Sequence, residues 1–103
     1  MGACDFTTRA RGKTAADAFS SAVASAQYED GHGGYTGTIA EKSDFIVITP
    51  DPGESPAACV DRLMESDDRR IRDKWGPAGC VDCGPDPKNP TWCVFLFFGW
   101  ASS

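Results

Sequence analysis

The chain has 103 residues, of which 41% are hydrophobic and 24% are charged, and its formal net charge is −5. This length fits one domain, 1–103, with a single hydrophobic core. The acidic balance argues against direct binding to nucleic acid, which needs a basic surface. The start of the chain lacks the features of an export signal, and no apolar run is long enough to span a membrane, so we expect a cytoplasmic protein.

The first third of the chain predicts a strand followed by a helix. Alternation over 4–9 predicts the strand. Thr14 is expected to cap a helix that runs to about Glu29, with Asp17 placed for a capping box. Four apolar residues fall on the face that we expect to be buried: Phe19, Ala22, Val23 and Ala26. Gly31 can end the helix because glycine readily adopts positive φ.

The middle of the chain predicts two strands and a second helix. Strands are expected at 35–40 and 45–49, and the second is apolar on both faces, which favours a central place in the sheet. Ser55 is expected to cap the helix, with Pro56 in its first turn. The buried stripe of this helix would contain Val60, Leu63 and Met64.

The last third predicts two more strands, at 80–83 and 91–100, the latter apolar on both faces. The three prolines in 84–90 favour a stiff, extended loop between them. The order strand, helix, strand, strand, helix, strand, strand predicts an α+β domain with two helices packed on one face of a mostly antiparallel sheet.

The segment 31–42, GHGGYTGTIAEK, holds four glycines and the only histidine of the chain. Glycine loses more backbone entropy on folding than other residues, so such a cluster favours a tight turn or a loop that a ligand or partner approaches closely. As a binding loop, it would use seven residues: Gly31, His32, Gly33, Gly34, Tyr35, Thr36 and Lys42. A lone histidine without an assigned partner gives no convincing catalytic group, so we do not expect an enzyme.

Basic residues offer two further candidate sites. Gly12-Lys13-Thr14 has the context of a phosphate loop, but the full motif needs a glycine at Thr7. Only a simple anion site remains, formed by the helix start with Lys13 and Arg11 nearby. The charged run 65–74 is either a solvated surface or a docking surface that uses three arginines: Arg69, Arg70 and Arg72. The next residue, Trp75, is expected either in the core or at the rim of a groove.

The five cysteines are Cys4, Cys59, Cys80, Cys83 and Cys93. Without an export signal we expect reduced thiols. Cys80 and Cys83 form a C-x-x-C pair, which Cys93 and either His32 or Cys59 could complete as a zinc site. A redox pair is a further alternative, although the strand context and the following Gly84-Pro85 argue against it.

Three segments, 31–42 (GHGGYTGTIAEK), 73–79 (DKWGPAG) and 97–102 (FFGWAS), resemble a set of small uncharacterised proteins of bacteria and bacteriophages. The chain departs from this set at 83–93, where it carries a longer loop. The resemblance implies a cytoplasmic, stand-alone domain from a phage or mobile element, and it implies no catalytic residue.

The leading hypothesis is therefore a non-enzymatic binding protein, such as a phage- or mobile-element-encoded inhibitor of a host defence protein. We expect a host or phage protein as its partner, no cofactor or metal, and a monomeric or homodimeric state. Its contact surface would combine 31–36 with Trp75 and the arginines before it. The alternative is a protein that binds or sequesters a small anionic ligand, or a small enzyme, with Lys13 and Lys42 among the contacts. The third hypothesis is a structural zinc domain.

Overall fold

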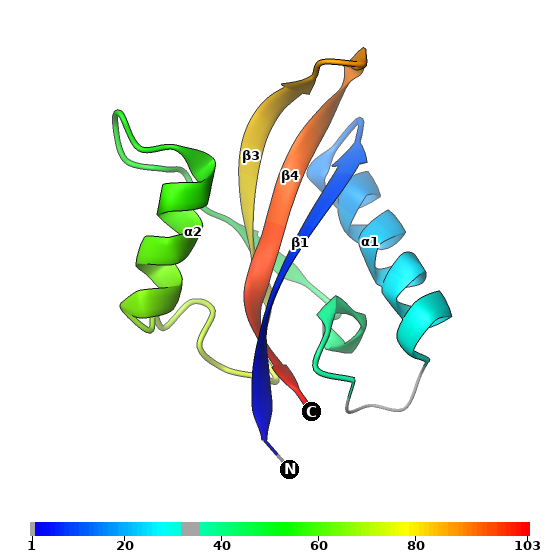
Figure 1. The fold of residues 1–103 in the computed structure, drawn as a ribbon, viewed down its shortest axis with the longest axis vertical. Coiled ribbons are helices and arrows are strands. Elements are labelled where there is room, and N and C mark those ends of the chain that lie inside the picture. Colours follow the sequence, from blue (N-terminus) through cyan, green and yellow to red (C-terminus); the bar gives the residue numbers. More distant parts are fainter. Residues whose placement is uncertain (1, 32–35) are drawn as a thin grey trace.

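Residues 2–31 and 36–103, which the computed structural model describes, fold into a four-stranded sheet with an α-helix on each face (Figure 1). In chain order the elements are β1 (Ala3–Gly12), α1 (Ala15–Asp30), the short 3₁₀ helix η1 (Ile39–Glu41), β2 (Phe45–Val47), α2 (Pro56–Glu65), β3 (Ala78–Asp86) and β4 (Asn89–Ser102).

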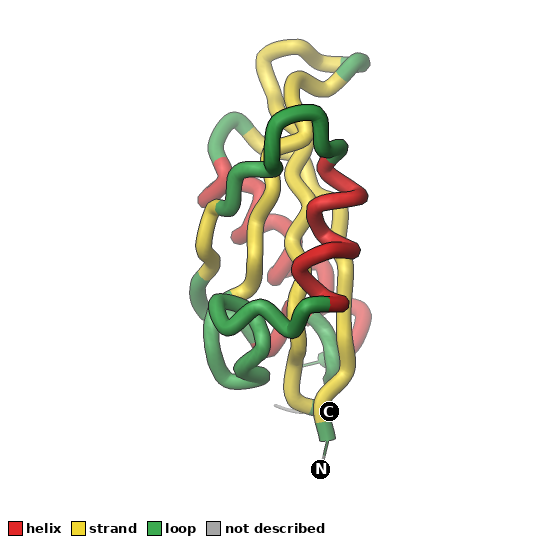
Figure 2. Tube along the Cα trace, turned by 90° about the vertical axis from the view of Figure 1, so that its left-hand side faces the viewer, coloured by secondary structure: helices red, strands yellow, loops and turns green. Residues whose placement is uncertain are grey.

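The last strand, β4, lies in the interior of the sheet, whose order is β1-β4-β3-β2. Figure 1 labels β4 between β1 and β3, and Figure 2 shows the strands from the side. It pairs antiparallel with β1 and with β3, whereas β2 runs parallel to β3. The sheet is thus mostly antiparallel and the domain is α+β, as predicted. The strand predicted at 45–49 is present, but it is a three-residue edge strand and not a central one. The interior place goes to β4, which is much longer and apolar on both faces.

The two helices cover opposite faces of the sheet, so the prediction that both pack on one face is wrong. Phe97 and Phe98 are neighbours on β4 and point to opposite sides, and both are fully buried. Phe19 of α1 packs against Phe97, with 5.5 Å between ring centroids, whereas Leu63 of α2 belongs to the cluster around Phe98. A strand that is apolar on both faces requires a cover on each of them.

The helix boundaries follow the predicted caps to within one residue. Thr14 Oγ1 accepts a hydrogen bond from the Asp17 N–H at 3.1 Å, and Ser55 Oγ accepts one from the Ala58 N–H at 3.1 Å. Gly31 has a φ of +85°, and its N–H donates to the Gln27 carbonyl at 2.8 Å, which ends α1. These contacts satisfy backbone groups that a helix end leaves without partners.

Of the strand predicted at 35–40, the structure describes residues 36–40, and these do not form a strand. The N–H and hydroxyl of Thr36 both donate to the Glu41 carboxylate, and Thr38 Oγ1 accepts from the Ala40 N–H. Side chains that bond nearby backbone groups offer the chain an alternative to strand pairing. The result is a turn and the short helix η1.

The proline-rich segment 84–90 is a tight hairpin and not the predicted extended loop. β3 continues to Asp86 and β4 begins at Asn89, which leaves a two-residue turn. Pro85 lies between two register shifts in the pairing of β3 with β4, and proline is tolerated at such irregularities.

Candidate functional site

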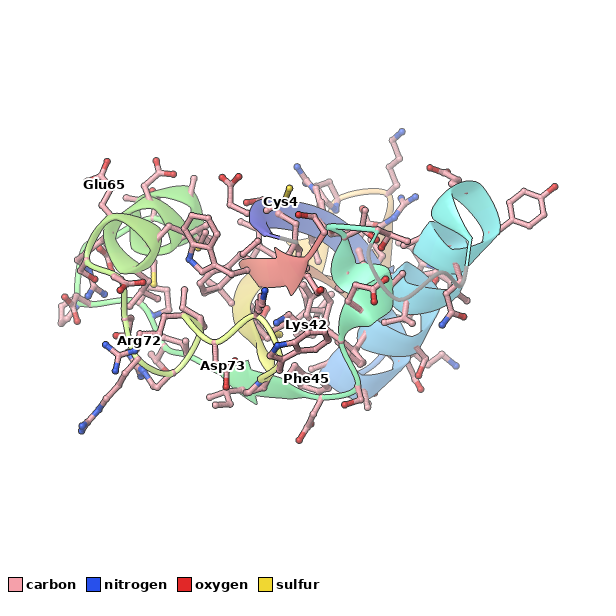
Figure 3. All side chains as sticks on the ribbon, turned by 90° about the horizontal axis from the view of Figure 1, so that it is seen from below. Cys4, Lys42, Phe45, Glu65, Arg72 and Asp73 are labelled. Carbon is pink, nitrogen blue, oxygen red and sulfur yellow. The ribbon has the colours of Figure 1, made fainter. Side chains whose placement is uncertain are left out.

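Segments far apart in the sequence meet at the end of the sheet where the two chain termini lie (Figure 1). The Gly37 N–H donates to the Ser102 carbonyl at 2.8 Å. Lys42 reaches from the same segment to the turn formed by 73–76, as seen from below in Figure 3. We call residues 36–42 and 73–76 the Lys42 end.

Lys42 is a structural residue of this end, which corrects its prediction as a ligand contact. Its Nζ donates to the carbonyl oxygens of Asp73 (3.3 Å), Lys74 (3.2 Å) and Gly76 (2.9 Å). An ammonium group has three donors, and all three are used here. Only 4% of the residue is exposed, and burial lowers its pKa, an effect that the carboxylate of Asp73 opposes in part. Lys42 therefore has no donor left for a ligand.

The turn that Lys42 holds presents Trp75 to solvent, with 64% of the residue exposed. The Trp75 N–H donates to Asp73 Oδ1 and the Gly76 N–H to the Asp73 carbonyl, both at 2.9 Å. The Lys74 ammonium lies 5.6 Å from the Trp75 ring centroid. A buried lysine and a tight turn thus fix the backbone beneath an exposed aromatic ring, which excludes the expected core position.

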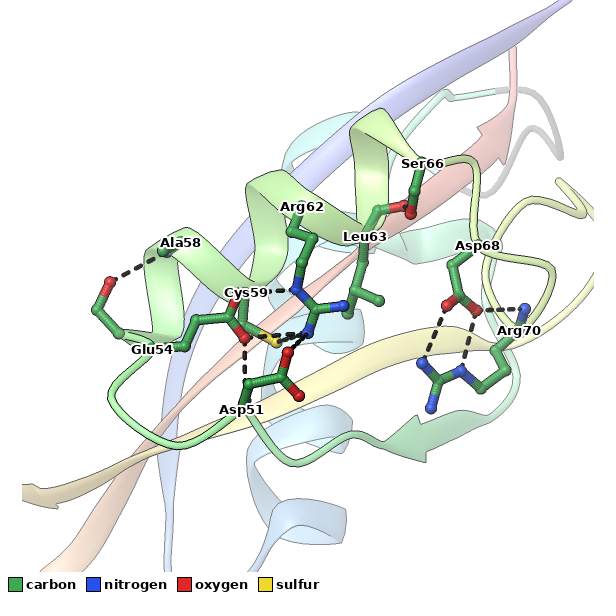
Figure 4. A network of polar contacts seen from close by, with 10 residues as sticks. Asp51, Glu54, Ala58, Cys59, Arg62, Leu63, Ser66, Asp68 and Arg70 are labelled. Carbon is green, nitrogen blue, oxygen red and sulfur yellow. Dashed lines mark hydrogen bonds and ion pairs between the residues drawn. The ribbon is translucent and has the colours of Figure 1, made fainter.

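The three predicted arginines lie on the segment that leads from α2 to this turn, and all three are exposed. Ile71, only 1% exposed, anchors the segment to the core. Arg70 is already engaged, because its Nε and Nη2 donate to the Asp68 carboxylate at 2.9 Å each (Figure 4). This pairing holds the pKa of Asp68 at about 2. Arg69 and Arg72 are the members of this set that could reach a carboxylate or phosphate on a partner.

Of the glycine-rich candidates, the structure describes Gly31, at the end of α1, and Thr36, at the start of the Lys42 end. The Thr36 hydroxyl is used internally, at 2.7 Å from Glu41 Oε2 and 2.8 Å from Thr38 Oγ1. Four of the predicted contacts lie outside the described residues: His32, Gly33, Gly34 and Tyr35.

Lys13 does not belong to the same site as Lys42, which corrects the anionic-ligand hypothesis in its predicted form. Lys13 is exposed just before α1, and Lys42 follows the segment that leaves the other end of this helix. The 16 residues of α1 separate the two ends by about 24 Å, at 1.5 Å of rise per residue. One small molecule cannot contact both side chains.

A second group of basic residues, which the prediction did not include as a site, lies where the β3–β4 hairpin meets β1. A pocket of about 390 Å³ there is lined by Arg9, Arg11 and Lys88, together with Asp86. Asp86 is buried and accepts from Arg11 Nη1 at 3.2 Å and from the Lys88 N–H at 3.0 Å. The Lys88 N–H and Arg11 hold its pKa below the ordinary value. We call these four residues the hairpin end; the two-residue spacing of Arg9 and Arg11 on a strand was the available sequence signal.

The described cysteines do not come together as the zinc-site alternative requires, and its possible fourth ligand His32 lies outside the described residues. Cys80 is fully buried under α1, and burial, with Asp82 nearby, raises its pKa to about 12. Cys83 lies three residues further along β3, where strand alternation directs it to the other face. Among residues 2–31 and 36–103, no group of three or more histidine, cysteine or acidic side chains is arranged to hold a metal ion.

Comparisons with protein-family models, with curated proteins and with solved structures found no match to this chain. Among the described residues, neither α-helix has the length and apolar character needed to cross a membrane.

Proposed function

We propose that this chain is a non-enzymatic binding protein that contacts another protein through the Lys42 end, with Trp75 at the centre of the contact. The observation that carries the proposal is the buried Lys42, whose three hydrogen bonds hold an exposed tryptophan on a fixed turn. The resemblance to small phage and bacterial proteins supports a cytoplasmic inhibitor of a host defence protein, encoded by a phage or mobile element.

Two physical features favour a protein partner. Tryptophan is among the residues that contribute most to protein–protein affinity, because its large ring buries much area at a low entropy cost. A turn that is already ordered loses little further entropy on binding. The net charge of −5 also favours a partner with a basic surface, since complementary charge accelerates association.

The experiment compares three forms of the tagged full chain, expressed in the cell that normally carries it. Proteins that co-purify with the parent are quantified against those retained by Trp75→Ala and by Tyr28→Ala. Tyr28 is the matched control, since it is also an aromatic residue and 92% exposed, but lies on α1. Loss of one protein with Trp75→Ala alone supports the proposal; equal retention by all three forms contradicts it.

A second candidate function, the binding of a small anionic ligand, is favoured by the pocket at the hairpin end. Three cationic side chains gather there in a chain that is acidic overall. Inorganic phosphate and a nucleoside triphosphate should then raise the melting temperature of the parent, because a ligand that binds only the folded state stabilises it. Lys88→Ala should reduce the shift and Arg72→Ala should preserve it. A melting temperature unaffected by either anion would exclude this candidate for phosphate compounds.

A further inference from the structure

β1 is an edge strand of ten residues, and its outward backbone groups can be assigned from the register. Gly2 and Ser103 donate to each other's carbonyls, at 3.3 and 3.2 Å, so they form a hydrogen-bonded antiparallel pair. The pairing continues without a shift from Ala3↔Ser102 to Gly12↔Cys93. Even-numbered residues of β1 therefore bond to β4. Odd-numbered residues point their N–H and C=O groups away from the sheet: Ala3, Asp5, Thr7, Arg9 and Arg11.

These outward groups have no backbone partner among the described residues, and no described strand lies beyond β1 (Figure 3). A groove of about 680 Å³ runs beside the strand, between β1 and α1. The side of α1 that lines it carries the small residues Ser21 and Ser25, followed by Glu29. Small side chains leave room for a further strand to lie against β1.

The opposite edge of the sheet is protected in the ways that proteins commonly use. β2 has only three residues, and Pro50 and Pro52 follow it closely. Short edge strands and prolines prevent pairing with another chain. The part of β3 beyond Cys80 is also an edge, but it carries Pro85 and register shifts. The β1 edge has neither proline nor a register shift, so its outward backbone groups are available for pairing.

The sequence of β1 is complementary to itself in an antiparallel register centred on Thr7. A register centred on Thr8 would place Asp5 opposite Arg11, but Arg11 is already paired with Asp86. Since outward groups must face outward groups, odd residues of one copy lie opposite odd residues of the other. With Thr7 on the two-fold axis, Asp5 lies opposite Arg9 of the second copy, and this pair occurs twice. Asp5 and Arg9 are exposed and have no ion-pair partner in the described part of the chain. Arg11 keeps its ion pair with Asp86 and faces a small residue, Ala3 of the second copy.

We propose that two copies of this chain form a symmetric dimer in which their β1 strands pair antiparallel about Thr7 and join the two sheets into one. Opposite charges and paired threonines directly across two strands both stabilise an antiparallel pair. The contact uses the same surface on both copies and so closes at two. The edges at the two ends of the joined sheet, made by the short β2 and by the Pro85 part of β3, disfavour further growth. The antiparallel pairing also directs the two Lys42 ends to opposite ends of the dimer.

The test is sedimentation velocity of the full chain at low salt, over concentrations from about 1 to 100 μM, the range typical of weak to moderate association. The parent should shift from monomer to dimer with rising concentration. In Arg9→Asp, the new aspartate of each copy lies opposite Asp5 of the other copy, so two repulsive pairs replace two attractive ones. Dimerisation should weaken by about tenfold or more. Asp5→Arg should do the same, and the double variant Asp5→Arg/Arg9→Asp should restore the dimer because both pairs are exchanged.

Two further variants complete the design. Thr7→Pro removes an outward N–H without affecting a bond to β4, so it should abolish the dimer while circular dichroism remains that of the folded parent. Arg72→Asp, an exposed charge change outside β1, should leave dimerisation unchanged. A parent that stays monomeric at 100 μM overturns the proposal, as does a dimer that is insensitive to Arg9→Asp and Thr7→Pro. A double variant that fails to restore the dimer overturns the register.

Discussion

The Lys42 end and the hairpin end hold their basic residues in opposite ways. At the Lys42 end, one lysine is 4% exposed and gives all its donors to three backbone carbonyls. At the hairpin end, Arg11 keeps 54% of its side chain exposed while it pairs with the buried Asp86, and Lys88 remains exposed. A basic residue that organises the fold is thus unavailable to a partner, and one that is available contributes little to the fold.

The largest effect should come from Lys42→Met, which leaves three carbonyls without a donor. Because unsatisfied buried acceptors are costly, the free energy of unfolding should fall by about 3 kcal/mol. Lys13→Met, an exposed lysine at the other end of α1, is the matched control and should change it by less than about 0.5 kcal/mol. Urea unfolding measures both. Equal effects of the two variants would mean that the hydrogen bonds of Lys42 do not stabilise the fold.

Two glycines sharpen the comparison, because Gly79 beside the Lys42 end is tightly packed and Gly84 in the β3–β4 hairpin is not. A Cβ atom at Gly79 would lie 2.5 Å from the buried ring of Phe98, so Gly79→Ala should cost about 2 kcal/mol of unfolding free energy. Gly84 has open space around it but a φ of +92°, so Gly84→Ala should cost about 1 kcal/mol through backbone strain alone. Thermal unfolding measures both variants. A larger loss of stability in Gly84→Ala than in Gly79→Ala would contradict this ranking.

A smaller, pH-dependent effect on stability should arise from the ion pair between Glu54 and Arg62, which belongs neither to the Lys42 end nor to the hairpin end. A hydrogen bond from Arg62, with a further bond from the Asp51 N–H, holds the pKa of Glu54 at about 2, below the ordinary 4.5 (Figure 4). Since the pKa is lowered on folding, the pair stabilises the protein above pH 4.5, and this contribution is lost as the pH falls toward 2.

Glu54→Gln should therefore reduce stability near pH 6 and flatten its decline between pH 4.5 and 2. Glu65→Gln, an exposed carboxylate at the end of α2, is the control and should keep the slope of the parent. The urea concentration at half-unfolding, measured across this pH range for the parent and both variants, tests these expectations. An unchanged slope in Glu54→Gln would show that the pair does not contribute to acid sensitivity.

The smallest effect is expected from chemical labelling of the cysteine thiols, which leaves the fold intact and measures how accessible each thiol is. Cys4 is exposed, whereas Cys59 and Cys80 are fully buried and burial raises both their pKa values. A maleimide under native conditions should label Cys4 first and leave the two buried thiols unreacted until the protein unfolds. Peptide mass spectrometry identifies the labelled positions. Early labelling of Cys80 would mean that the core under α1 opens readily.

Local sequence signals predicted the elements that local contacts define. Thr14 and Ser55 were identified as caps because a cap bonds backbone only three residues away. The sequence also predicted correctly that β4 is apolar on both faces, because successive side chains of a strand point to opposite sides. The same alternation, apolar on both faces, already required a cover on each side of the sheet, so the placement of the helices could have been predicted.

Long-range contacts explain the errors. Nothing near Lys42 in the sequence reveals that its partners are 31 to 34 residues further along the chain. Lys42 was interpreted as a ligand contact, whereas the structure uses its charge to hold a turn. The basic pocket was missed because Arg9 and Lys88 come together only when β1 and the β3–β4 hairpin meet across the sheet.

The most direct test of the proposed function is photo-crosslinking from position 75 in the producing cell. The full chain carries p-benzoylphenylalanine in place of Trp75 in one form and in place of Tyr28 in the other, so both probes replace exposed aromatic residues. The proposal predicts a covalent adduct with one distinct protein from position 75 and none with that protein from position 28. Adducts that form equally from both positions, or only from position 28, would contradict the assignment of the Lys42 end as the partner surface.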